Sequence, residues 1–448
     1  MKNDIPIKLI LLLIFIVQAV ALCPQKKIYI SDIIPDDAYF GDTITVTGGG
    51  FLEAGNSITL NNKPLSTDNF VLGNINANEL QLNLYDVLED NFFQITNTDG
   101  ISIKQFKTKS LSKIEYFNPV QYDFSYEVNI SNIRPAKKGD IVYVHIPQPV
   151  LSNELTFFDV QSVSPQPQYI QDNGVLVYTI DTNRTDRLTF RQEFCITTRY
   201  KKVIYDNSAD QLHLDFDRQS EFYKYYTREE RPFIIPNDIT VQKKVADILG
   251  ENKDSMTDGE KVKKIYQWVS TRMVHKYPPE NRSPLFTMQK GEGDCLSDNY
   301  LFASLIRAAG YPIRLNSGYI IYHTFLVGGF HFWAEVFIPG TGWVPFDSSF
   351  GHSEIFLKEQ KYETTTDFYD GGTDGRRISF CNGRVRLMLP DNDGKLEFYR
   401  YLNQFQVPVA TSKYSKNIFY NYNVSKKLAV KKINKLYDEL QNKFIKEK

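Results

Sequence analysis

The stretch Gly291–Pro312, GEGDCLSDNYLFASLIRAAGYP, decides how the second half of the chain is interpreted. Glycines and acidic residues precede Cys295, and a run with helical spacing follows it and ends at Gly310. A helix that begins at Cys295 would place the thiol at the positive end of the helix dipole, where a thiolate is stabilised. A cysteine on a helix is by itself more often structural, so its role depends on the rest of the chain.

The segments around this stretch predict an α+β domain. Residues 238–250 and 257–273 have apolar side chains at helical intervals, and Thr257 and Glu260 have the spacing of a capping box. Alternating residues then predict three strands, at 313–323, 330–338 and 343–347. Helices followed by antiparallel strands are typical of the α+β class.

A histidine and an aspartate follow on the predicted strands. His331 lies inside an alternating strand, whereas the other five histidines lie in β-rich regions, at a helix end or beside loops: His145, His213, His275, His323 and His352. A turn centred at Pro339 would place His331 and Asp347 opposite or nearly opposite each other on antiparallel strands. A turn centred at Thr341 would separate them and could flip the face, so the sequence allows the productive register without proving it.

The order G-x-C, H-x-W-x-E and G-W-V-x-x-D over about residues 236–350 resembles the transglutaminase-like core, a relative of the papain-like cysteine proteases. The residues that carry it are Gly293, Cys295, His331, Trp333, Glu335, Gly342, Trp343, Val344 and Asp347. The resemblance implies that Cys295 attacks a carbonyl carbon, that His331 accepts the thiol proton and that Asp347 orients His331.

The resemblance also implies an oxyanion site and a thioester intermediate. The backbone N–H of Cys295 would be one oxyanion donor, with Tyr277 or Gln289 as candidates for the second. We expect water to resolve the thioester, which makes the protein a hydrolase of peptide or amide bonds in a protein or peptide substrate. A protein-glutamine transamidase and a non-catalytic adhesion or scaffolding protein are the alternatives.

No cofactor or metal is expected. Residues 367–375 and 391–394 are rich in Asp and Gly, but neither carries a full calcium-loop pattern, and both are typical of solvated turns. The formal net charge of -1 does not favour a nucleic-acid partner.

The N-terminal half predicts two all-β sandwiches, at 22–108 and 109–228, because short alternating strands follow one another with turn residues between them. The order from Ile33 to Phe51, IIPDDAYFGDTITVTGGGF, resembles the IPT/TIG immunoglobulin-like domain, which implies a spacer or binding module whose partner is unknown. The catalytic domain is expected over 229–400. Residues 401–448 are expected to form an extension with a basic helix, from Ser425 onward.

Residues 1–21 predict a cleaved signal peptide. Lys2 and Lys8 precede an apolar run from Leu9 to Leu22 that is too short to span a membrane comfortably, and small residues stand at 19–21. We therefore expect a secreted or extracellular protein (periplasmic, cell-surface or lysosomal, depending on the host) with no integral membrane segment after cleavage. Attachment of a lipid at Cys23 is the bacterial alternative.

If the protein is exported, its cysteines can form disulfides and its asparagines can be glycosylated. The pairing of Cys23, Cys195 and Cys381 is left open, including a Cys195–Cys381 bridge. In a eukaryotic host, the chain would be a glycoprotein with sequons at three asparagines: Asn129, Asn183 and Asn423.

Overall fold

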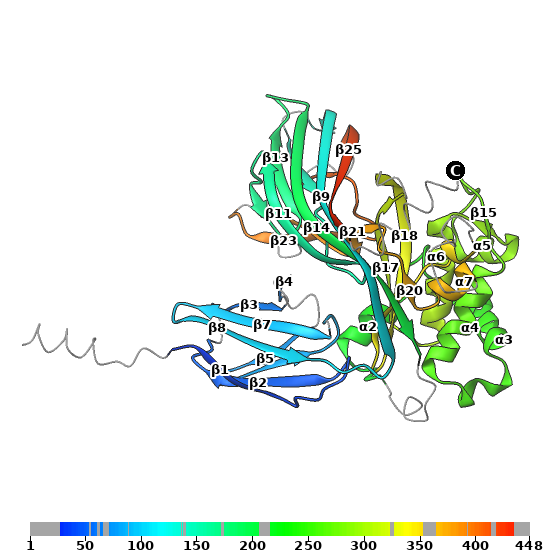
Figure 1. The fold of residues 1–448 in the computed structure, drawn as a ribbon. Coiled ribbons are helices and arrows are strands. Elements are labelled where there is room, and N and C mark those ends of the chain that lie inside the picture. Colours follow the sequence, from blue (N-terminus) through cyan, green and yellow to red (C-terminus); the bar gives the residue numbers. More distant parts are fainter. Residues whose placement is uncertain are drawn as a thin grey trace, which may run out of the picture. The chain divides into compact units, whose positions relative to one another are not determined.

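The computed structural model describes residues 27–433, except 53–54, 61–62, 66–70, 88, 136, 138–139, 172–173, 206–215, 323–326, 353–363, 392 and 414–417. The predicted signal peptide, Cys23 and the predicted helix beyond residue 433 lie outside these residues. The chain divides into two compact units, Met1–Lys109 and Ser110–Lys448, which are described separately (Figure 1).

The first unit is all-β, as the sequence predicts. Its strands are β1 (Tyr29–Ile34), β2 (Thr43–Gly49), β3 (Ser57–Leu60), β4 (Lys63–Pro64), β5 (Leu72–Ile75), β6 (Glu79–Asn83), β7 (Asp90–Asn97) and β8 (Gly100–Lys107). They form two four-stranded sheets, in the orders β1-β2-β6-β5 and β4-β3-β7-β8. Both sheets contribute to one buried cluster, which includes Val46 and Leu80 from one sheet and Phe93 and Ile95 from the other.

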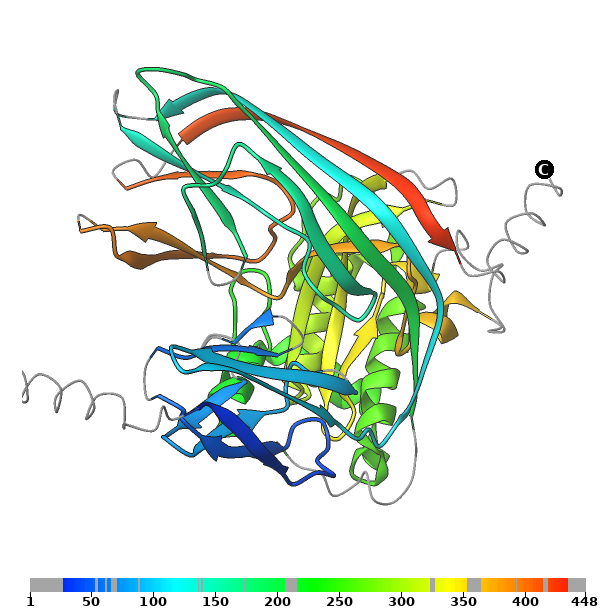
Figure 2. The same ribbon diagram turned by 60° about the vertical axis from the view of Figure 1, so that its left-hand side comes forward.

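The second unit begins with a β-rich region. Its strands are β9 (Lys113–Pro135), β10 (Ile141–Ile146), β11 (Leu155–Ser164), β12 (Tyr169–Ile170), β13 (Leu176–Asp181), β14 (Leu188–Ile204), β24 (Val409–Ser412) and β25 (Ile418–Ile433). One sheet has the order β12-β13-β10-β24 and the other β11-β14-β9-β25. The long strands β9 and β14 run side by side, with β25 along the other side of β9 (Figure 2). Alternate residues of β9, such as Tyr122 and Phe124, are buried in the shared core.

Strand β25 corrects the prediction of a helix from Ser425. The segment from 418 to 433 is a strand that pairs with β9 from Ile418↔Pro135 to Ile433↔Val120. Its partly buried apolar side chains that pack on the core all lie an even number of residues apart. They are Ile418, Tyr420, Val424, Leu428 and Val430. That spacing places one face of a strand against the core, and it outweighs the helical stripe that begins at Ile433. Thus part of the predicted extension completes the second β-rich region.

Between β14 and β24 lies an α+β core. Its helices are α2 (Glu221–Thr227), α3 (Ile239–Leu249), α4 (Asp258–Ser270), α5 (Pro284–Lys290), α6 (Cys295–Ala308) and α7 (Thr365–Tyr369). Its sheet has the order β19-β18-β17-β21. These strands are β17 (Ile313–Ile321), β18 (Val327–Ile338), β19 (Gly342–Phe346) and β21 (Arg377–Asn382). A hairpin of β22 (Val385–Pro390) and β23 (Leu396–Leu402) follows.

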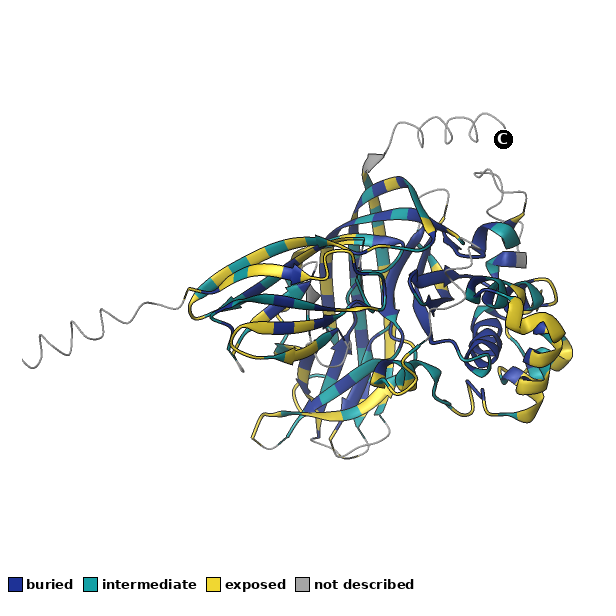
Figure 3. Ribbon diagram, turned by 90° about the horizontal axis from the view of Figure 1, so that it is seen from below, coloured by how far each residue is buried: buried dark blue, intermediate teal, exposed yellow. Residues whose placement is uncertain are grey.

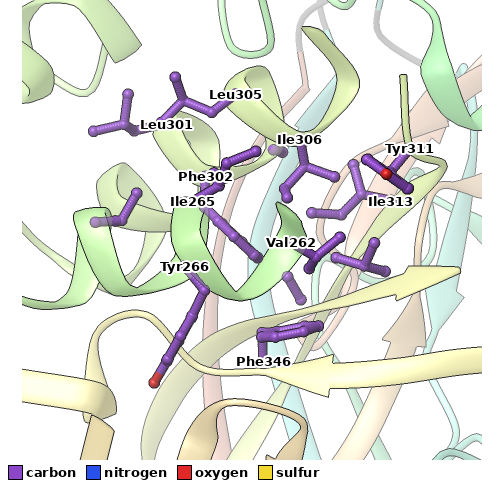
Figure 4. Close-up of a cluster of buried hydrophobic side chains, with 14 of the residues drawn as sticks. Val262, Ile265, Tyr266, Leu301, Phe302, Leu305, Ile306, Tyr311, Ile313 and Phe346 are labelled. Carbon is purple, nitrogen blue, oxygen red and sulfur yellow. The ribbon is translucent and has the colours of Figure 1, made fainter. Parts of the chain in front are cut away.

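Helix α6 is the centre of this core. Almost all its side chains are buried, and it contacts α3, α4 and α5 as well as β17 and β18 (Figure 3). Val262 and Ile265 of α4 pack with Phe302 of α6 and Phe346 of β19 in one apolar cluster (Figure 4). A helix enclosed in this way holds its first turn in a fixed position, and that turn carries Cys295.

The predicted helix boundaries are confirmed at α4. The Thr257 hydroxyl accepts from the Glu260 N–H, and the Glu260 side chain accepts from the Thr257 N–H, so the capping box is complete. Helix α3 ends as the sequence predicts, because Gly250 follows it with a φ of 73°.

Candidate active site

Cys295 is the first residue of α6, and the residue before it fixes the turn. The Asp294 carboxylate caps the helix by accepting from the Ser297 N–H at 2.9 Å. Its other oxygen accepts from Arg282, with Nη2 at 2.6 Å. Burial opposes ionisation, but these hydrogen bonds hold the pKa of Asp294 below its ordinary value. Gly293 must be small, since a Cβ there would lie 2.7 Å from the Ser297 Cβ.

The side chain of Cys295 is half-buried against β18. The sulfur takes part in a backbone hydrogen bond with Phe332, the residue that follows His331. The Asn299 side chain links the same two elements, because its Nδ2 donates to the carbonyl of Cys295 at 2.6 Å and to that of Phe332 at 3.0 Å. The first turn of α6 is therefore tied to the strand that carries His331.

The environment of Cys295 favours the neutral thiol. Burial, followed by the charge of Asp294, raises the pKa of Cys295 to about 12, and Asp347 adds to the effect while the Phe332 hydrogen bond opposes it. The lowering expected from the helix N-terminus is thus outweighed by burial and by nearby carboxylates. A thiol in this position needs a base that takes up its proton and becomes positively charged beside it.

His331 and Asp347 are in direct contact, with His331 Nε2 2.6 Å from Asp347 Oδ2. The strand register differs by one residue from a turn centred at Pro339, because Ile338 pairs with Gly342 and Ala334 pairs with Phe346. Extending this register places Asp347 across from Trp333, two residues from His331. A shift of the turn centre by one whole residue moves the pairing by two, so both side chains stay on the same face.

The imidazole of His331 is held on two sides. Its ring stacks on Phe350 with centroids 4.1 Å apart and an angle of 17° between the planes. Since Nε2 faces the carboxylate, Nδ1 is the ring nitrogen available to accept a proton from a thiol.

The Asp347 carboxylate receives several partners. Oδ1 accepts from the Ser349 hydroxyl at 3.0 Å and from the Phe350 N–H at 2.8 Å. Arg377 Nη1 lies 2.7 Å from Oδ2. Burial would raise the pKa of Asp347, but His331, Arg377 and these hydrogen bonds hold it well below its ordinary range. Asp347 is therefore ionised at neutral pH.

Arg377 belongs to the same cluster, although no sequence pattern indicates it. It lies on β21, 30 residues after Asp347, and both side chains are 1% exposed. Its Nη2 also donates to Asp374 at 2.7 Å, and Asp374 accepts from the Tyr369 hydroxyl at 2.7 Å. The face of Trp333 lies 5.1 Å from the guanidinium carbon. This buried cation thus joins two carboxylates.

Glu335 of the H-x-W-x-E pattern has a structural position. Its side chain is fully buried, with Arg314 Nε donating to Oε2 at 2.6 Å and Asn153 donating to Oε1. Asn153 precedes β11 and also accepts from Lys201 at 2.6 Å. Glu335 therefore connects the sheet that carries His331 to the β-rich region of the same unit.

The two candidates for the second oxyanion donor lie in different places. Strands β15 (Val274–His275) and β16 (Glu292–Gly293) pair in parallel, with His275 opposite Gly293. Tyr277 lies two residues after the end of β15, and Cys295 lies two residues after the end of β16. Gln289 is an exposed residue near the end of α5.

Of the remaining candidates, His145, His275, Cys195 and Cys381 have described side chains. His145 is buried with Nε2 2.8 Å from the Thr411 hydroxyl, and burial lowers its pKa to about 3. His275 is exposed, whereas His213 and His323 lie outside the described residues. Cys195 and Cys381 are separate free thiols, so the bridge left open above is not formed.

The expectation of a solvated turn is wrong for residues 367–375, because residues 368–375 are buried and Asp370 and Asp374 pair with cations, whereas the turn at 391–394 caps its own backbone. Lys263 lies 3.1 Å from Asp370, and Asp391 accepts from the N–H groups of Asp393 and Lys395. Across the described ranges, no three His, Cys, Asp or Glu side chains gather as metal ligands would. Within the same ranges, no helix is long and apolar enough to cross a membrane.

An α+β core with a cysteine at a helix start, beside a histidine–aspartate pair on an antiparallel sheet, defines a papain-like class of architecture. No curated protein matches the sequence. A solved candidate cysteine protease from Cytophaga hutchinsonii is 14% identical, with 72% of this chain and 94% of that chain covered and a TM-score of 0.45. A candidate protease from Parabacteroides distasonis is 10% identical, with coverages of 67% and 61% and a TM-score of 0.22.

Residues 243–348 match the family model described as the transglutaminase-like superfamily. This part of the chain belongs to that superfamily, and it contains Cys295, His331 and Asp347. The chain therefore has an all-β N-terminal region and a transglutaminase-like core. Arg377 lies beyond the matched residues.

Proposed function

We propose that this protein is an exported cysteine enzyme that hydrolyses peptide or amide bonds through a thioester on Cys295. The contact between His331 and Asp347 beside the first turn of α6 carries the proposal. A thiol, an imidazole and a carboxylate in this order can generate a nucleophile, receive its proton and stabilise the resulting charge.

The raised pKa of Cys295 makes proton transfer to His331 the central step. His331 Nδ1 takes the thiol proton as the sulfur attacks the substrate carbonyl carbon. The same proton then passes to the departing amine as the carbon–nitrogen bond breaks, which leaves the acyl group on sulfur. Water attacks this thioester with His331 as base, and the acid product leaves as the thiol is restored.

Asp347 suits the positive charge that His331 gains in this step. Its carboxylate lies 2.6 Å from Nε2, so it can stabilise the imidazolium that forms when Nδ1 takes the thiol proton. Arg377 and the hydrogen bonds from Ser349 and Phe350 hold this carboxylate in place.

The oxyanion of the tetrahedral intermediate would lie at the start of α6. The backbone N–H of Cys295 is one donor in this proposal. Tyr277 is the better candidate for the second, because the β15–β16 register brings it toward Cys295, and its 75% exposure leaves its hydroxyl accessible to a substrate.

An alkylating probe tests the nucleophile. The wild-type protein is expected to be labelled at Cys295 at neutral pH faster than a free thiol, because His331 takes up the proton of a thiol whose own pKa is raised, and Cys295→Ala is expected to lose this label. Asp347→Ala should slow labelling while circular dichroism shows an intact fold. Labelling no faster than a free thiol would contradict the enzymatic proposal.

A second assay separates hydrolysis from transamidation, since water and an amine can both resolve the thioester. A peptide library is incubated with the protein and a primary amine, and the products are identified by mass spectrometry. Cleaved or deamidated peptides would support the hydrolase. Predominant incorporation of the amine would support the transamidase instead, and no product with a labelled Cys295 would leave neither reaction supported.

A further inference from the structure

A cluster of arginines surrounds one buried carboxylate at the other end of α6. Glu230 Oε1 lies 2.8 Å from Arg307 Nη1 and 3.3 Å from Arg228 Nη2, and Oε2 lies 3.5 Å from Arg384 Nε. The side chains of Glu230 and Arg307 are only 7% and 4% exposed. Arg314 also lines this region, but its charge is balanced by Glu335.

The cluster carries an excess of positive charge. Three guanidinium groups face the single Glu230 carboxylate, which leaves two positive charges without a balancing carboxylate inside the cluster. Burial lowers the pKa of Arg307, and Arg228 and Arg384 lower it further while Glu230 opposes them. An arginine stays charged at neutral pH, so this repulsion is a free-energy cost that a bound anion would relieve.

A cavity opens at this cluster. It is a narrow cavity, partly open to solvent, and its walls include Tyr225, Tyr226 and Tyr300. Arg307 lines it, and the buried Nε of Arg307 has no hydrogen-bond partner among the described residues. A nearly buried donor without a partner, beside unbalanced charge, is what an anion site requires.

The arginines at the edge of the cluster are held in place by aromatic rings. The guanidinium carbon of Arg228 lies 3.6 Å from the centroid of the Tyr225 ring, and that of Arg384 lies 4.3 Å from the Tyr401 ring. Stacking of this kind fixes the planar groups before a ligand arrives, which reduces the ordering cost of binding.

We propose that this cavity is a binding site for a small oxyanion, above all a carboxylate. Planar guanidinium groups match the two oxygens of a carboxylate better than they match a spherical ion. Arg307, which lines the cavity, lies on α6 twelve residues after Cys295, which is about 18 Å along the helix axis, and an extended peptide of about six residues can span that distance. The carboxylate can therefore come from a free anion or from an acidic group of a substrate.

Binding is tested on the full-length protein with acetate as the probe. Thermal unfolding and calorimetric titration are measured with sodium acetate, with sodium chloride keeping the ionic strength constant. Wild type is expected to show a saturable rise in Tm, and Arg384→Gln is expected to bind acetate at least tenfold more weakly. Arg191→Gln, which alters an exposed pair with Glu127, should bind like wild type.

Either of two results would overturn the proposal. If wild type shows no saturable binding, or if Arg384→Gln and wild type bind acetate equally, the cavity is not an oxyanion site. Should Arg384→Gln fail to fold by circular dichroism, Arg228→Gln replaces it, since that side chain also lies at the edge and is 25% exposed.

A kinetic arm separates the two sources of the carboxylate, and this arm alone rests on the proposed hydrolase. If the site holds a substrate group, acetate should raise the KM of wild type for acidic peptides and leave the KM for neutral peptides unchanged. Saturable acetate binding without this effect assigns the site to a free anion. Loss of all turnover with intact acetate binding would count against the hydrolase and not against the anion site.

Discussion

Replacement of Arg377 by Met is the most informative perturbation of the buried cluster. The substitution removes the cation that lies 2.7 Å from both Asp347 and Asp374. It leaves the carboxylates of Asp347 and Asp374 buried without the cation that contacts both of them. Breaking a buried pair by removing one partner costs about 3–5 kcal/mol, so we expect a loss of that size in the free energy of unfolding.

A double substitution tests whether charge is the cause. Arg377→Met together with Asp374→Asn removes one positive and one negative charge, so the net charge around Asp347 returns to that of wild type. The double variant is expected to be more stable than the sum of the single losses predicts by about 1–3 kcal/mol. Each single loss is measured by urea unfolding, followed by the fluorescence of the core tryptophans.

An exposed arginine provides the matched control. Arg191 donates to Glu127 at 3.0 Å through Nε, but its side chain is 58% exposed. Arg191→Met should therefore lower the free energy of unfolding far less than Arg377→Met does. If Arg377→Met costs as little as this control, or if the double variant shows strictly additive losses, the charge-balance account of the cluster is wrong.

Three further predictions concern stability around the core. Burial, with the charge of Glu335, raises the pKa of Glu154 from 4.5 to about 7. The folded state then holds this proton more tightly, so its contribution is full below pH 4.5 and declines as pH rises to about 7. Glu154→Gln should remove that decline, worth at most about 3 kcal/mol, in urea unfolding at a series of pH values. Asn299→Leu should remove the two hydrogen bonds that Nδ2 donates to the carbonyls of Cys295 and Phe332, cost about 1–3 kcal/mol, and slow alkylation of Cys295; an unchanged alkylation rate would mean that Asn299 does not position the thiol. Thr257→Ala should cost about 1 kcal/mol through the lost cap, with no change in alkylation.

The α+β core was predictable because its signals are local. The capping residues Thr257 and Glu260 lie three positions apart, and the strand that carries His331 alternates within a few residues. The turn is centred one residue later than predicted. His331 and Asp347 still lie on the same face, because moving the turn centre by one residue shifts the strand pairing by two residues. Local periodicity therefore sufficed to bring the histidine and the aspartate together.

The parts that could not be predicted depend on contacts between distant segments. Arg377 reaches Asp347 because β21 pairs with β17, and neither strand carries a sign of that pairing in its own sequence. The thiol pKa of Cys295 depends on burial and on charges gathered from several elements. The strand at 418–433 follows from its pairing with β9, which begins about 300 residues earlier in the chain.

The pairing of β25 with β9 has a consequence for synthesis. Because the chain emerges from the ribosome in order, β9 and the catalytic core are made before residue 418 is added. Until then, one side of β9 is an open edge, and long open edges promote association between chains. A stop codon between β21 and β25 would therefore leave the residues of the candidate active site encoded but remove the strand that closes the sheet. Nascent or truncated chains should need a chaperone at that stage, even though every residue proposed for catalysis is already present.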